Sequence, residues 1–143
     1  MLMARIDTSA QWRHFLVVRL LRRWSAEGAA GGAQPPSLVS LAGELGERAE
    51  TAIAIASLFQ LTESCLGRPL RAECCCSREL GADEQAVLLL LDAAPGLAPG
   101  RSTRTIPHGL PGALVWAAKS VRLLLGETKS APSASPRGCP FGR

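Results

Sequence analysis

Residues 12–24 read WRHFLVVRLLRRW and combine apolar and basic side chains at helical spacing. Apolar residues three and four positions apart are typical of an amphipathic helix that packs one face into a core. The stretch therefore predicts a helix over 9–27. Its apolar stripe is formed by Leu16, Val17, Leu20, Leu21 and Trp24. Its solvated side is expected to carry a basic surface of Arg19, Arg22 and Arg23.

The longest predicted helix follows a linker at 28–36 (GAAGGAQPP), whose glycines are flexible and whose prolines cannot continue a helix. Ser37 is a residue type favoured at a helix N-cap, so we expect the helix over 38–66, ending at Gly67. Gly43 and Gly46 each weaken its start by roughly 1 kcal/mol relative to Ala, which favours a late start or a bend there. Its core seam contains Leu38, Leu41, Leu45, Ala52, Ala56 and Phe59, flanked by Ile53.

Two shorter helices are predicted after this one. Asp83 and Glu84 supply the negative charge favoured in the first turn of a helix over 82–94. A Gly- and Pro-rich connection then leads to a helix over 112–125 with Gly126 as its C-cap. The apolar face of this last helix contains Leu110, Leu114, Ala117, Ala118, Val121, Leu124 and Leu125.

The sum of these segments is an all-α fold, either a small four-helix bundle or an orthogonal array of helices. The chain of 143 residues is 47% hydrophobic, which is enough for one core and predicts a single helical domain at 1–126. Residues 127–143 are rich in Ser, Pro and Gly, and we expect them to form a disordered C-terminal tail. No apolar run approaches the roughly 20 residues that cross a bilayer.

The richest chemistry lies in RAECCCSRELGADE at 71–84, where Cys74, Cys75 and Cys76 are consecutive. Five cysteines are an odd number, and this spacing is not that of a disulfide framework, so a reducing cytoplasm is the predicted location. Arginines interrupt the first apolar stretch, which argues against a secretory signal. An Arg-rich mitochondrial transit peptide is the alternative for a eukaryotic source.

Three interpretations of the triplet stay open. Cys74 and Cys76 can share a metal ion such as Zn²⁺ if the segment is extended, with Cys65, His108 or Cys139 completing the ligand shell. A reactive thiol is the second, with Arg71 and Arg78 lowering a thiol pKa and Glu73 and Glu79 opposing them. The third is packing, in which Cys65 and Cys75 are small buried hydrophobes. No C-x-x-C pair occurs, and no resident cofactor is expected, zinc being the alternative.

The segment from Cys74 to Leu91 resembles a family of small uncharacterised proteins from alphaproteobacteria, sphingomonads in particular. The resemblance rests on the cysteine triplet, the Ala82-Asp83-Glu84 step and the apolar helix that follows. Members of that family tend to carry Pro where this chain has Ser77. The family has no assigned activity, so the resemblance implies a bacterial, cytoplasmic setting and leaves the chemistry open.

Other candidate sites are weaker. The first helix has the composition of one that lies on an anionic membrane surface, the alternative being an ordinary core helix. Nucleic-acid binding is not favoured, because no helix-turn-helix or zinc-finger pattern accompanies the arginines. Neither His14 nor His108 has the local signature of an activated nucleophile, although a Cys76–His108 dyad in space is a minor alternative. Glu44, Glu47 and Glu50 predict a solvated acidic face able to pair with the arginines of the first helix.

These patterns predict a non-catalytic interaction or regulatory protein whose cysteine cluster senses thiol redox state or binds metal. The partner is expected to be another protein or a second copy of this chain, and no small-molecule substrate is identified. A peripheral membrane protein and a structural zinc protein are the alternatives. The net charge of +4 suits an acidic partner.

Overall fold

The computed structural model describes residues 8–96 and 110–127, and these form helices with no strand among them. The expected all-α fold is confirmed. The elements are α1 (Thr8–Ala29), α2 (Gln34–Glu44), α3 (Ala49–Leu66), α4 (Ala82–Ala93), the short 3-10 helix η1 (Ala94–Gly96) and α5 (Leu110–Glu127). The predicted tail, together with His108 and Cys139, lies outside the described residues except for Glu127, which belongs to α5.

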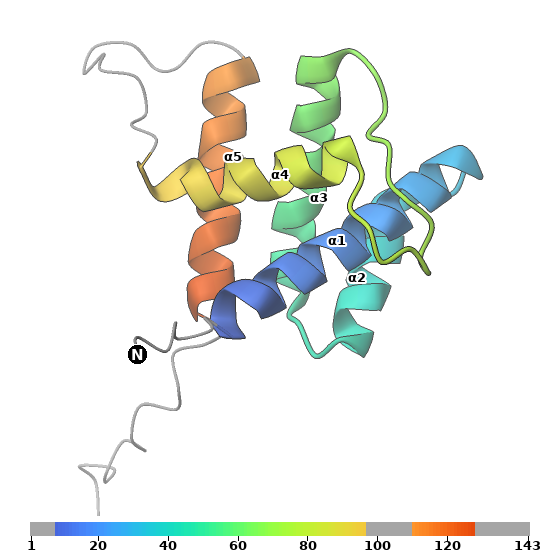
Figure 1. Ribbon diagram of the computed structural model, residues 1–143, viewed down its shortest axis with the longest axis horizontal. Helices are drawn as coiled ribbons and strands as arrows, with labels where there is room; N and C mark the ends of the chain where they lie inside the picture. Colours follow the sequence, from blue (N-terminus) through green and yellow to red (C-terminus); the bar gives the residue numbers. More distant parts are fainter. Residues whose placement is uncertain (1–7, 97–109, 128–143) are drawn as a thin grey trace, which may run out of the picture.

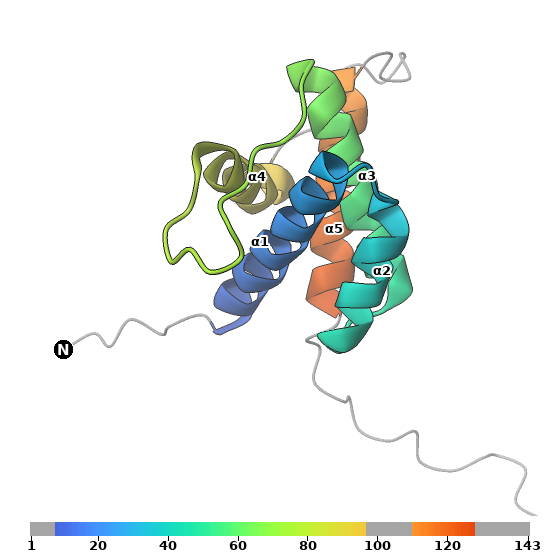
Figure 2. The same ribbon diagram turned by 90° about the vertical axis from the view of Figure 1, so that its right-hand side faces the viewer.

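The helices form an orthogonal array rather than a bundle of parallel helices. In Figure 1, α3 and α5 run side by side, and α4 runs across them. Helix α2 packs against both α1 and α3, and α1 also contacts α4 (Figure 2). None of the helices in the described part of the chain is long and apolar enough to cross a membrane.

The apolar stripe of α1 is buried in the core, as its spacing predicts. Trp24 lies edge-on against Phe59 of α3, with ring centroids 5.7 Å apart. Such aromatic pairs contribute about 0.5–1.5 kcal/mol beyond the burial of their surface. The indole N–H of Trp24 donates to Glu63 Oε1 at 3.0 Å, so the buried ring keeps no unpaired donor. The stripe is thus part of the core, whereas a helix that lies on a membrane surface would need its apolar stripe exposed.

The single helix expected over 38–66 is wrong, because the chain forms α2 and α3 with a turn between them. Gly46 has a φ of +80°, the left-handed conformation that ends helices and that glycine adopts without steric cost. The N–H of Glu47 donates to Ala42 O at 2.8 Å and the N–H of Gly46 to Gly43 O at 3.1 Å, the pattern of a Schellman motif. The turn also leaves Ile53 exposed rather than beside the core seam.

The predicted linker and N-cap also need correction. Helix α2 begins at Gln34 rather than after Ser37, which lies inside the helix. Pro35 and Pro36 occupy its first turn, where backbone N–H groups have no partner within the helix and a proline loses nothing. The predicted stop at Gly67 is confirmed by its φ of +70°, whereas Gly126 does not end α5, which continues to Glu127.

Gly46→Ala is expected to destabilise the protein by about 1 kcal/mol, because a left-handed φ strains any residue with a Cβ. The space around Gly46 is empty, so the cost is conformational and not steric. Gly43→Ala is the matched control: this glycine lies inside α2 with open space around it, and the change is expected to stabilise by about 0.5–1 kcal/mol. Urea unfolding followed by circular dichroism measures both, and equal signs would contradict the assignment of Gly46 as the helix stop.

Candidate functional site

The cysteine triplet lies in a long loop between α3 and α4, residues 67–81, here called the cysteine loop. It passes along α1 on its way to α4 and stands out from the helices in Figure 2. A loop of this length without regular structure needs partners for its backbone polar groups. Side chains from three helices supply them.

The central anchor is an ion pair between Arg22 of α1 and Glu84 of α4. Arg22 Nε donates to Glu84 Oε1 at 2.7 Å, and Arg22 Nη2 lies 3.3 Å from Oε2. The Glu84 side chain is fully buried and that of Arg22 is 8% exposed. Burial raises the pKa of Glu84, but hydrogen bonds from Arg22 and the Gly81 N–H outweigh it, and the pKa is lowered. The pair is therefore ionised at neutral pH.

Both partners of this ion pair also hold the backbone of the cysteine loop. Arg22 donates to Ser77 O at 2.8 Å and to Glu79 O at 3.0 Å. Glu84 accepts the N–H groups of Glu73 at 3.2 Å and Gly81 at 2.8 Å. The loop is thus fastened immediately before and immediately after the triplet.

A second anchor fixes the start of the loop. Arg68 forms a bidentate pair with Asp83 of α4, at 2.7 and 2.9 Å. This hydrogen bonding lowers the pKa of Asp83 to about 2. Asp83 Oδ2 also accepts the N–H of Arg71 at 2.7 Å, and Glu63 Oε1 accepts the N–H of Leu70 at 2.9 Å. Asp83 and Glu84 therefore hold the loop as well as supplying charge at the start of α4.

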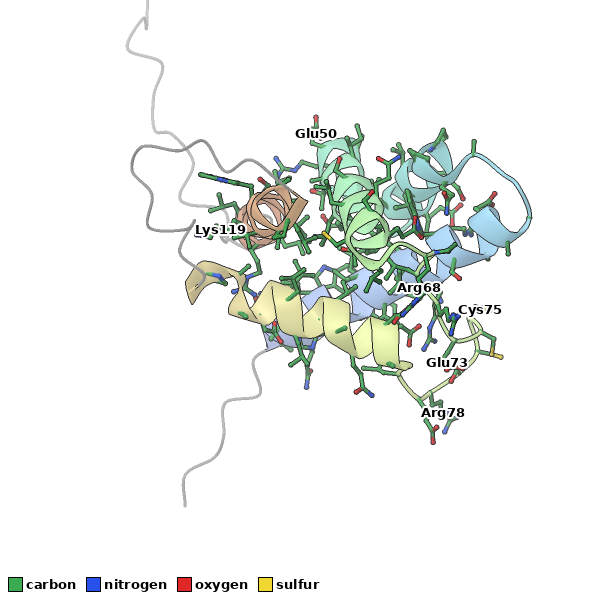
Figure 3. All side chains as sticks on the ribbon, turned by 90° about the horizontal axis from the view of Figure 1, so that it is seen from above. Glu50, Arg68, Glu73, Cys75, Arg78 and Lys119 are labelled. Carbon is green, nitrogen blue, oxygen red and sulfur yellow. The ribbon has the colours of Figure 1, made fainter. Side chains whose placement is uncertain are left out.

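The triplet itself forms a turn at the tip of the loop. The N–H of Ser77 donates to Cys74 O at 3.0 Å, which closes a β-turn with Cys75 and Cys76 at its centre. The turn brings Cys74 Sγ and Cys76 Sγ to 3.0 Å, while Cys75 points away from the body of the protein (Figure 3). Pairing of Cys74 with Cys76 was expected for an extended segment, but a turn produces it.

All cysteines of the described residues are exposed, so the packing interpretation of Cys65 and Cys75 is wrong. The reason is their location: Cys75 is at the tip of a loop and Cys65 is on the outer side of α3 near its end. Free thiols exposed in this way are open to oxidants and to other thiols.

The two neighbouring thiols differ in acidity. The hydrogen bond from Cys76, with further backbone N–H groups and the charge of Arg22, lowers the pKa of Cys74. The same hydrogen bond raises the pKa of Cys76. The charge that favours the Cys74 thiolate is thus Arg22, whereas Arg71 and Arg78 were the expected sources. Cys74 is therefore the thiol of the pair that deprotonates more readily.

Cys65 does not join this pair in a metal-binding cluster. Within residues 8–96 and 110–127, no group of three or more Cys, His, Asp or Glu side chains is placed to hold a metal ion. His14, the one histidine among the described residues, lies against Asp92, with its Nε2 3.0 Å from both carboxylate oxygens. Of the predicted ligands, only Cys74 and Cys76 are shown together.

The predicted basic surface is partly wrong. Arg19 and Arg23 are exposed, but Arg22 turns inward to Glu84 because that carboxylate would otherwise be buried without a counter-charge. The predicted acidic face is solvated at Glu44 and Glu50, while Glu47 accepts the indole N–H of Trp12 at 3.2 Å.

Sequence reasoning missed the anchoring roles of Arg22, Glu63, Asp83 and Glu84. One signal was present: Glu84 stands three residues after Gly81, the spacing at which a carboxylate reaches back to the N–H before a helix. The usual Ser or Thr at the N-cap is replaced by glycine, which hides the pattern. The contacts of Arg22 join residues more than fifty positions apart and have no local signature.

No family model, curated protein or solved structure matches this chain. The resemblance seen at Cys74–Leu91 stays a prediction, and function is argued from the site alone.

Proposed function

We propose that this protein is a small, non-catalytic regulatory protein that senses thiol redox state through reversible oxidation of Cys74 and Cys76. The observation that carries the proposal is the 3.0 Å separation of their Sγ atoms on an exposed turn. A disulfide has an S–S length of about 2.04 Å, so a shift of about 1 Å closes the bond. Two protons and two electrons leave the pair, the electrons going to an oxidant such as a small disulfide.

The anchors of the loop support a sensing role. Because Glu73 and Ser77 are tied to Glu84 and Arg22, closing the bond leaves the flanking backbone in place. Oxidation then changes the shape and charge of the tip alone, which is the part that a partner can touch. A partner protein or a second copy of this chain would read that change.

A reducing compartment belongs to the same proposal, since reversal of the bond requires a pool of thiols. Cytoplasmic location fits this requirement. Zinc binding by the two thiols is the alternative. A structural zinc site needs four donors, however, and the described residues bring only two cysteines together.

The test equilibrates the protein in glutathione buffers of graded thiol-to-disulfide ratio, followed by alkylation, trypsin digestion and mass spectrometry. The fragment Ala72–Arg78 contains the triplet and no other cysteine. We expect it to lose two hydrogen atoms and to retain one alkylated cysteine in oxidising buffers, and to carry three alkylated cysteines in reducing ones.

Single variants identify the bonded pair. Cys75→Ser should keep the disulfide at the same ratio, and Cys65→Ser, a change on α3 outside the cysteine loop, is the matched control. Cys74→Ser and Cys76→Ser should each abolish the disulfide within this fragment. A fragment that stays fully reduced in every buffer, or a disulfide that disappears in Cys75→Ser, would overturn the proposal.

A further inference from the structure

A groove of about 600 Å³ lies beside the triplet, between α1 and the cysteine loop. Cys74 and Cys75 line it on the side of the loop, and Arg19, Arg22 and Arg23 line it on the side of α1. Its remaining lining is mainly small or apolar, with Ala26, Ala29, Leu41 and Ala72 among the residues. Cys76 is not part of the lining. The groove therefore reaches one thiol of the pair and not the other.

The groove has an excess of positive charge. The guanidinium of Arg22 is compensated by Glu84, but none of the ion pairs found among the described residues involves Arg19 or Arg23. Arg19 lies over the ring of Phe15, 5.9 Å from its centroid, which leaves its charge available. Glu73 is the one acid in the lining, and its carboxylate is turned toward Gly81. The lining thus contains one carboxylate and two arginines without an ion-pair partner in the described part of the chain.

We propose that this groove binds an anionic low-molecular-weight disulfide, that of a short peptide thiol with free carboxylates, and presents it to Cys74. The proposal rests on the proposed function, because it names the oxidant that the Cys74–Cys76 pair senses. Arg19 and Arg23 bind the carboxylates of the disulfide, while the small apolar side chains leave room for its backbone. The volume is sufficient for a ligand of this size.

The exchange proceeds in two balanced steps. The Cys74 thiolate attacks one sulfur of the bound disulfide, the S–S bond breaks, and one small thiolate leaves with its electron pair. Cys76 then loses its proton to solvent and attacks Cys74 Sγ, 3.0 Å away, which releases the second small thiolate. Across both steps, Cys74 and Cys76 lose two electrons and two protons, and one small disulfide is reduced to two thiols.

The assignment of Cys74 as the attacking thiol has two supports. It is the member of the pair that lines the groove. Its pKa is also the lowered one of the pair, which favours the thiolate of Cys74 over that of Cys76. In Cys76→Ser the second step is blocked, so the mixed disulfide at Cys74 should accumulate as a stable mass increase.

The experiment compares two disulfides on the reduced full-length protein: glutathione disulfide, which is anionic, and 2-hydroxyethyl disulfide, which is neutral. The variant Arg19→Gln/Arg23→Gln removes the two uncompensated charges of the groove. The matched control Arg71→Gln/Arg78→Gln removes two positive charges from the cysteine loop, at residues that do not line the groove. Samples are quenched at successive times by acid, and the second-order rate constants are obtained from the mass spectra of the quenched samples.

We expect Arg19→Gln/Arg23→Gln to slow the reaction with glutathione disulfide by about tenfold and to leave the reaction with the neutral disulfide within about twofold. The control variant should slow neither reaction by more than about twofold. Equal slowing with both disulfides, or equal slowing in the control, would overturn the groove as the binding site. Failure of the unmodified protein to form the Cys74–Cys76 bond with either disulfide would instead overturn the proposed function.

Discussion

Arg22→Met is expected to lower the free energy of unfolding by about 3–5 kcal/mol, because it leaves the buried carboxylate of Glu84 without its counter-charge. The carbonyls of Ser77 and Glu79 lose their donor at the same time. Methionine fills much of the space of the arginine stem, so the cost arises from charge and hydrogen bonding more than from a cavity. Guanidinium unfolding followed by tryptophan fluorescence, to which buried Trp24 contributes, measures it.

Two further variants separate these causes. Arg23→Met changes the exposed neighbour on the same helix and should alter stability by no more than about 0.5 kcal/mol. The double variant Arg22→Met/Glu84→Gln removes the unpaired charge but keeps an acceptor for the Gly81 N–H, and it should be more stable than Arg22→Met alone. Equal stability of Arg22→Met and Arg23→Met would contradict the anchoring role of the ion pair.

Acid is expected to release the cysteine loop before the helices unfold. The pKa of Asp83 is lowered to about 2 from an ordinary 3.8, so its contribution is complete above about pH 4 and is lost as the pH falls through 2. With allowance for screening of the partly exposed Arg68, the loss is about 1–2 kcal/mol. The pKa of Glu84 is lowered too, so its protonation adds a loss of the same sign.

Stability measured by urea unfolding between pH 7 and pH 2 tests this expectation. Asp83→Asn and Arg68→Gln should each be less stable at pH 7 and should each show a flatter dependence below pH 4, since both remove the same ion pair. Protection of the Arg71 amide against hydrogen exchange, taken relative to its intrinsic rate at each pH, should fall over the same range, because Asp83 accepts that N–H. An unchanged acid dependence in Asp83→Asn would contradict the assignment.

The helical fold could be predicted because helix spacing is a local property of the sequence. The stripe of α1 and the stop at Gly67 were both readable from residues within one or two turns of each other. Gly43 and Gly46 indicated a late start or a bend, but a glycine inside an apolar pattern is also tolerated in a helix, and only the left-handed φ of Gly46 shows a complete break. The start of α2 was predicted too late for a similar reason. Pro35 and Pro36 indicated a linker, but prolines are also favoured in the first turn of a helix.

The candidate site was predictable only as a set of residues and not as an arrangement. The triplet was visible, but its turn depends on anchors from α1 and α4 that no local pattern reveals. The inward turn of Arg22 follows from the burial of Glu84, a tertiary property. Charge periodicity alone places Arg19, Arg22 and Arg23 of α1 in solvent, which holds for Arg19 and Arg23.

The anchors of the cysteine loop engage its main chain and leave the side chains at its tip unused. They bind the N–H groups of Leu70, Arg71, Glu73 and Gly81 and the carbonyls of Ser77 and Glu79. The stability of the fold therefore depends little on which side chains stand at residues 74–76. Mutation can exchange the chemistry displayed there, or a designer can graft another tripeptide onto it, while the helices beneath stay unchanged.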